Sequence, residues 1–202
     1  MATHPFIYLL ATFATLTLFA ASLFSSRLVV CEPGKAGVNL YFTHTSYQIA
    51  STSLDSIQLP KHVQSTSYDG DRNIDSNIGL YGKISFALQI SASYLLLFTL
   101  VSRTARANMF DIKFLDQHND KMLAILTFCT AITAAALIQA MVSAAGSLST
   151  ADVTIINALM TGNHVNSITS CTLGHAGYYA WAGAGLWGAM MIFAAREARM
   201  SV

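Results

Sequence analysis

Four stretches of the chain are apolar along almost their whole length. They cover residues 5–24, 80–101, 122–145 and 176–195. A helix that crosses a bilayer needs about 20 mostly apolar residues. The pattern therefore predicts an all-α membrane protein, in which residues 1–202 form a single bundle of four transmembrane helices.

The segments between these stretches differ in character. We expect residues 25–79 and 146–175 to form two outer loops and residues 102–121 to form an inner loop. The segment Val38–Thr52 is rich in Val, Tyr, Phe, Thr and Ile with partial alternation, which predicts one or two strands of a small sheet capping the helices. In the second outer loop, a helix-capping signal predicts a short helix near Ala151, followed by a turn around Gly162 and Asn163.

Composition supports the membrane assignment. The chain is 53% hydrophobic and only 10% charged, whereas a soluble domain carries about 25% charged residues. The net charge of +1 excludes a broad basic surface for nucleic acid. We therefore expect the partners to be the lipid bilayer and either further copies of the chain or other membrane subunits.

The positions of the cations predict the orientation. Lys and Arg concentrate in short cytosolic loops of membrane proteins. Residues 146–175 have none. The predicted inner loop and the C-terminal tail together have six: Arg103, Arg106, Lys113, Lys121, Arg196 and Arg199. Both termini are therefore expected in the cytosol, in a multi-pass protein of the plasma membrane rather than of an organelle.

The first apolar stretch has a second interpretation. It could be a cleaved signal peptide, which would leave three spans. No Lys or Arg precedes it, and its apolar run of about 20 residues is longer than a usual signal core. These features favour a retained span.

Two of the three cysteines lie at the predicted outer membrane surface. Cys31 begins the first outer loop and Cys171 ends the second. They could form a disulfide if that side is oxidising, or could remain two thiols. Cys129 lies inside the third stretch and is expected to be a small buried core residue.

Polar side chains are few within the apolar stretches. Gln89 and Gln139 lie within about two turns of each other in depth. They could hydrogen-bond across the bundle, or each could bond separately to a neighbouring hydroxyl or carbonyl. No Asp, Glu or Arg lies deep in a predicted span, which disfavours a pump, a proton-coupled transporter or a voltage sensor. A channel for small neutral solutes is the third functional class that we retain.

The sequence contains no recognisable catalytic or metal-binding motif. Two pairs of predicted outer-loop histidines could bind a surface metal, although solvated histidines are the simpler interpretation: His44 with His62, and His164 with His175. We therefore predict a non-enzymatic protein with no cofactor, metal site or catalytic residue.

The fourth apolar stretch is rich in small residues. Ala180, Ala184 and Gly188 are four residues apart on one helix face, and Gly183 lies beside them. Small residues at this spacing allow helix backbones to approach closely. This face could pack inside the bundle or could receive another subunit.

The segment before the second stretch reads "NIGLYGK", from Asn77 to Lys83. Together with four spans, a long strand-bearing first loop and a shorter second loop, it resembles the claudin-like tetraspan superfamily, which includes fungal PalI-type proteins and, more loosely, the amastins of kinetoplastids. In that superfamily the element is usually Gly-Leu-Trp followed by Cys, whereas Tyr81 and Gly82 stand at those two positions here. We expect Gly79, Leu80 and Tyr81 to clamp the first loop to the helix.

The resemblance implies a structural or interaction protein. It would act in membrane organisation, adhesion or self-assembly through its outer loops. The alternative is a small accessory subunit of a larger respiratory or transport assembly, which the small-residue fourth stretch favours equally.

Overall fold

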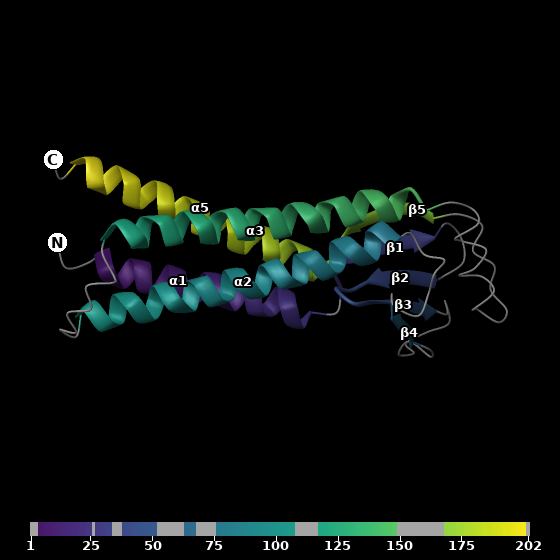
Figure 1. The fold of residues 1–202 in the computed structure, drawn as a ribbon. Coiled ribbons are helices and arrows are strands. Elements are labelled where there is room, and N and C mark those ends of the chain that lie inside the picture. Colours follow the sequence, from purple (N-terminus) through teal and green to yellow (C-terminus); the bar gives the residue numbers. More distant parts are fainter. Residues whose placement is uncertain are drawn as a thin grey trace, which may run out of the picture. The chain divides into compact units, whose positions relative to one another are not determined.

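The computed structural model describes residues 4–25, 27–33, 38–51, 63–67, 76–107, 117–148 and 168–200. The helices are α1 (His4–Phe24), α2 (Ser76–Ala107), α3 (Gln117–Gly146) and α5 (His175–Met200). The strands are β1 (Val29–Pro33), β2 (Val38–Phe42), β3 (Ser46–Ser51), β4 (Val63–Ser67) and β5 (Ile168–Leu173) (Figure 1).

In the described part of the chain, three helices contain a segment that is long and apolar enough to cross a membrane. These segments are Ile7–Phe24, Asn77–Val101 and Lys121–Gly146. They correspond to the first three predicted spans and indicate a multi-pass membrane protein. Helix α5 does not meet the same criterion, because glycine, tyrosine and tryptophan residues lower its apolar character.

The strands form one antiparallel sheet in the order β4-β3-β2-β1-β5. The predicted strands in Val38–Thr52 are confirmed as β2 and β3, which pair through a short turn. Strand β5 comes from the second connecting segment and pairs with β1, so two distant parts of the sequence complete one sheet. The helix expected near Ala151 and the turn at Gly162 and Asn163 lie outside the described residues.

The sheet has one strongly apolar face. Side chains alternate between the two faces of a strand, and the register of β1, β2 and β3 aligns the inward positions of all three. Five of these side chains are at most 3% exposed: Val29, Cys31, Leu40, Phe42 and Tyr47. Their burial explains why partial alternation was visible in the sequence.

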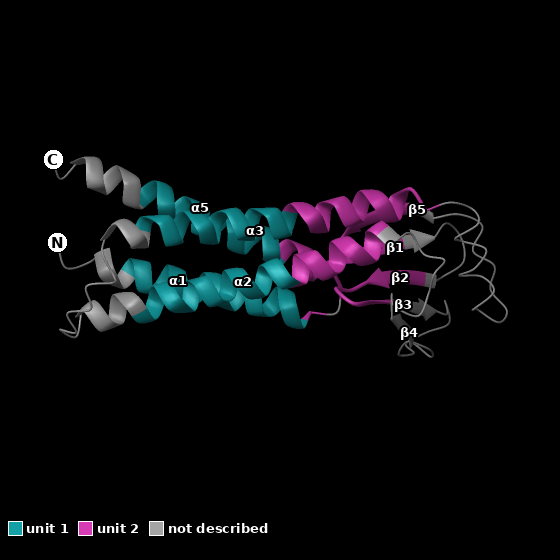
Figure 2. Cartoon of the chain, viewed as in Figure 1, with its two compact units in different colours: residues 1–24, 87–135, 179–202 teal, residues 25–86, 136–178 magenta. Residues whose placement is uncertain are grey.

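The chain divides into two compact units (Figure 2). Unit 1 comprises residues 1–24, 87–135 and 179–202, and unit 2 comprises residues 25–86 and 136–178. Unit 1 is helical, and all four helices contribute to its core: Phe19, Ala92, Leu96, Ala131, Ala184 and Trp187. Unit 2 contains the sheet and the adjoining parts of α2, α3 and α5.

Two buried threonine hydroxyls of unit 1 are hydrogen-bonded within their own helices. Thr15 donates to the carbonyl oxygen of Ala11 at 2.8 Å, and Thr99 donates to that of Leu95 at 2.8 Å. This bond to the preceding turn gives each hydroxyl an acceptor within its own helix. Threonine is therefore compatible with the apolar core.

Candidate functional site, a disulfide-closed sheet

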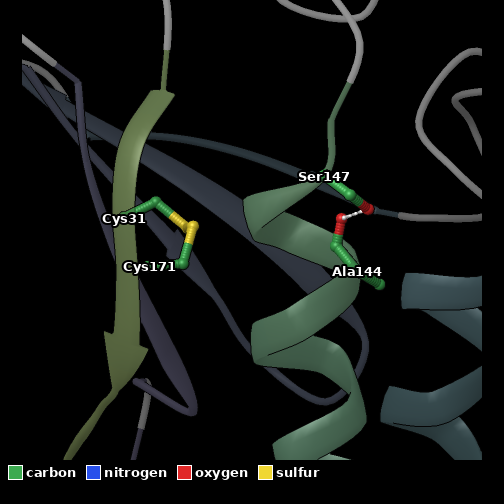
Figure 3. The surroundings of a disulfide bond; sticks show 4 residues. All are labelled: Cys31, Ala144, Ser147 and Cys171. Atoms are coloured by element: carbon green, nitrogen blue, oxygen red, sulfur yellow. Dashed lines mark hydrogen bonds between the residues drawn. A yellow bond between two sulfur atoms is a disulfide. The ribbon is translucent and has the colours of Figure 1, made fainter.

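The sheet is closed covalently at the junction of its two sequence segments. Cys31 of β1 and Cys171 of β5 are directly opposite in the register and form a disulfide (Figure 3). Their Cα atoms are 4.1 Å apart, near the spacing of a non-hydrogen-bonded antiparallel pair. The bond joins residues 140 positions apart in the sequence and fixes β5 to the rest of the sheet.

Backbone hydrogen bonds attach the start of α5 to the same edge. The amide of Gly174 donates to the carbonyl oxygen of Leu28 at 2.7 Å, and the amide of Ala176 donates to that of Arg27 at 3.0 Å. The carbonyl of Gly174 accepts the first helical bond, from Tyr178. A Cβ atom at Gly174 would collide with the Arg27 carbonyl oxygen, so this close approach requires glycine.

The turn between β2 and β3 is stabilised by one threonine. Thr43 Oγ1 accepts a hydrogen bond from the amide of Ser46 at 2.9 Å, and the Thr43 amide donates to the Ser46 carbonyl at 2.8 Å. Hydroxyl side chains commonly close turns in this way. The following turn residues, His44 and Thr45, are held in a defined position as a result.

This turn packs directly on α2. A Cβ atom at Gly82 would lie 2.7 Å from the carbonyl oxygen of His44, so the helix and the turn meet backbone to backbone. His44 is 5% exposed, and its Nδ1 lies 3.3 Å from Ser85 Oγ. Its ring centroid is 5.1 Å from that of Phe86. The second glycine of "GLYGK" is therefore the point at which the sheet reaches the helix.

The observed contact differs from the predicted clamp. Gly79 is buried, but Leu80 is 52% exposed and Tyr81 is only half-buried. The described contacts with the β2–β3 turn come from Gly82 and the following helical turn. The prediction therefore located the correct segment, but the residue in contact with the turn is Gly82 and not Tyr81.

The other face of the sheet carries a row of polar and apolar side chains. Thr172, Val30, Tyr41 and Gln48 are cross-strand neighbours in the register, and we call them the cross-strand row. Thr172 is exposed, while Val30 and Gln48 are half-buried. The Arg27 guanidinium lies 4.4 Å above the Tyr41 ring, a cation–π contact. This face offers a hydroxyl, an amide and a cation on a rigid surface.

The small residues of α5 that were predicted as packing or partner sites are used inside unit 1. Ala180 and Ala184 are at most 1% exposed. A Cβ atom at Gly183 would lie 2.5 Å from the Phe19 ring, and one at Gly188 would lie 2.7 Å from the Phe128 ring. Gly183 and Gly188 therefore accommodate aromatic side chains of α1 and α3, and Ala180 and Ala184 are buried.

The two predicted intramembrane glutamines differ in burial. Gln89 is 1% exposed, and neither polar atom of its amide has a hydrogen-bond partner among the described residues. Gln139 is exposed. Similar depth along two helices does not fix which way each side chain faces, and the sequence could not supply that angle.

Cys129 is an exposed free thiol and not the buried core residue that we expected. Its neighbours Ala131, Ala134 and Ala135 occupy the buried face of α3 instead. Among the described residues, no group of three or more His, Cys, Asp or Glu side chains is placed to hold a metal ion.

Comparison with known proteins adds no assignment. No protein-family model matches the chain, and no curated protein matches it significantly.

Proposed function

We propose that this chain is a non-enzymatic, claudin-like tetraspan protein that organises membranes, or joins them, by self-association through its sheet. In this proposal α5 is the fourth span, both termini lie in the cytosol, and the sheet lies on the opposite side of the membrane. The observation that carries the proposal is the closure of five strands from two separate segments by one disulfide.

The physical argument concerns preorganisation. A surface that is already rigid loses little conformational entropy when it binds a partner. The Cys31–Cys171 bond, the Gly174 junction and the Gly82 contact hold this sheet at three places. The cross-strand row can then present its polar groups without further ordering.

A two-tag experiment tests this proposal. Two differently tagged copies of the full chain are expressed together, extracted in mild detergent and purified through one tag. Thr172→Glu should reduce recovery of the second tag at least severalfold, because it places a charge beside Val30 at the end of the cross-strand row. Thr45→Glu is the matched control, since Thr45 is also exposed but lies in the β2–β3 turn.

Equal recovery from the wild type and from both variants would contradict self-association through this face. Recovery of unrelated membrane chains in fixed proportion would instead support the second function, an accessory subunit. The observation in its favour is Gly185, an exposed residue of α5 at which an added Cβ would meet nothing within 4 Å. A neighbouring helix could approach there closely.

A further inference from the structure

A groove of about 700 Å³ lies between α2 and α3 within unit 1. Exposed side chains form much of its lining: Tyr94, Phe98 and Val101 from α2, and Leu126 from α3. Sites that admit drug-sized molecules have volumes of about 300–1,000 Å³. The groove is therefore wide enough to receive several side chains of another helix.

Tyr94 is an unusual residue for this position. It is 69% exposed, and no described residue forms a hydrogen bond with its hydroxyl. It precedes Arg103 by nine residues, or about 14 Å along the helix axis. In the orientation proposed above, Arg103 lies at the membrane surface, which places Tyr94 about halfway through a hydrocarbon core of roughly 30 Å. Tyrosine normally favours the membrane interface, and a phenol within hydrocarbon needs a hydrogen-bond partner.

Ser91 supplies a complementary acceptor on the same face of α2. Its Oγ donates to the carbonyl oxygen of Ala87 at 2.9 Å, so its proton is used and its lone pairs remain available. Long side chains on a helix lean toward its N-terminus and cover the preceding turn. The Tyr94 hydroxyl is thereby carried toward the depth of Ser91.

We propose that the groove receives α2 of a second copy of this chain, with Tyr94 of each copy donating a hydrogen bond to Ser91 of the other. Two copies inserted in the same orientation are related by a two-fold axis along the membrane normal. At such an interface each contact occurs twice, with the roles of the copies exchanged. Tyr94 and Ser91 are about one helical turn apart, and the Tyr94 side chain extends toward the depth of Ser91. The hydroxyl of each copy can therefore reach the serine of the other copy.

The spacing along α2 supports helix pairing. The exposed residues in its part of unit 1 include a series with alternating separations of four and three: Ala87, Ser91, Tyr94, Phe98 and Val101. A repeat of seven residues keeps one helix face against a partner over several turns. Below the polar pair, Phe98 and Val101 continue this face and line the groove.

A lipid tail fits the groove less well. Acyl chains carry no hydrogen-bond acceptor at mid-bilayer depth and would leave the Tyr94 phenol unpaired. Thr130 also has a hydroxyl in the lining, but its Oγ1 donates to the Leu126 carbonyl oxygen of its own helix at 3.0 Å. Thr130 therefore cannot replace Tyr94 as the donor to an occupant of the groove. The second copy is thus the occupant that satisfies the polar groups present.

The first test measures self-association of the full chain in phosphatidylcholine vesicles. Energy transfer between two fluorescent populations, followed against the protein-to-lipid ratio, gives the dissociation constant. Tyr94→Phe removes both symmetric bonds and should raise this constant about eightfold, given the average strength of interhelical hydrogen bonds in membranes. Ser91→Ala should have the same effect, and the double variant should add nothing further.

Tyr178→Phe is the matched control, because Tyr178 is 58% exposed on α5. It should leave the dissociation constant unchanged. An unchanged dissociation constant in both Tyr94→Phe and Ser91→Ala would overturn the proposal. So would a double variant whose loss of association free energy equals the sum of the losses in the two single variants.

The second test locates the interface by disulfide crosslinking in a Cys129→Ser background. Ala87→Cys should crosslink between copies, because Ala87 lies on the proposed face. Ala14→Cys should not, although Ala14 of α1 is also exposed in unit 1. Crosslinking at Ala14 alone, or a monomeric chain purified with a lipid in the groove, would overturn the proposal. The interface tested lies within the membrane, so this result stands or falls separately from the role of the sheet.

Discussion

The contact between Gly82 and His44 gives the most direct test of how the sheet is attached to α2. In Gly82→Ala, the new methyl group would lie 2.7 Å from the His44 carbonyl oxygen and 3.4 Å from that of Thr43. Both obstructing atoms belong to the backbone of a turn that is fixed by the hydrogen bonds of Thr43. The turn cannot move aside without losing some of those bonds.

The size of the effect follows from two opposing contributions. Overpacking of a close contact costs about 1–3 kcal/mol. Replacing glycine by alanine within a helix recovers about 0.5–1 kcal/mol. We therefore expect Gly82→Ala to lower the free energy of unfolding by about 1–2 kcal/mol.

Unfolding of the purified chain in mild detergent, titrated with a denaturing detergent and followed by tryptophan fluorescence, measures this difference. Gly185→Ala is the control, because a Cβ atom there meets nothing within 4 Å. It should leave stability unchanged or raise it slightly. If the two variants unfolded at the same point, the attachment of the sheet through Gly82 would be refuted.

Three further predictions concern the disulfide and the core of unit 1. Replacing Cys31 and Cys171 by serine should destabilise the chain by about 2–4 kcal/mol, measured as a lower unfolding midpoint that reducing agent no longer changes. Gln89→Leu should raise stability by about 1–2 kcal/mol, because it removes a buried amide whose polar atoms lack partners among the described residues; a lower unfolding midpoint would contradict this. Trp187→Phe removes a 3.1 Å bond from its indole nitrogen to the Ala124 carbonyl and should cost about 0.5–1.5 kcal/mol, while Trp181→Phe, at an exposed position, should cost less in the same fluorescence-monitored titration.

Apolar length was the most reliable signal in the sequence. It located the three helices that are long and apolar enough to cross a membrane, because about 20 apolar residues are a direct requirement of the bilayer. Alternation in Val38–Thr52 likewise located β2 and β3. Both signals depend only on neighbouring residues, so one sequence is sufficient to read them.

Long-range arrangement could not be derived in this way. The pairing of β1 with β5 joins two segments that are distant in the sequence. The sequence contains Cys31 and Cys171 whether or not they are bonded, so two free thiols remained an alternative. The clamp was placed on Tyr81 because aromatic residues are conspicuous, whereas the need for glycine at position 82 comes from a carbonyl 38 residues earlier. The facing direction of Cys129 and Gln139 was equally inaccessible, since nearly every face of α3 is apolar or small.

Self-association of the chain can be measured by its native mass after gentle extraction of the tagged protein, with identification of whatever purifies with it. We expect even multiples of the 21.7 kDa chain, with the Cys31–Cys171 bond intact, and a smaller share of these multiples in Tyr94→Phe. A strictly monomeric mass, or a fixed stoichiometry with unrelated chains, would contradict it.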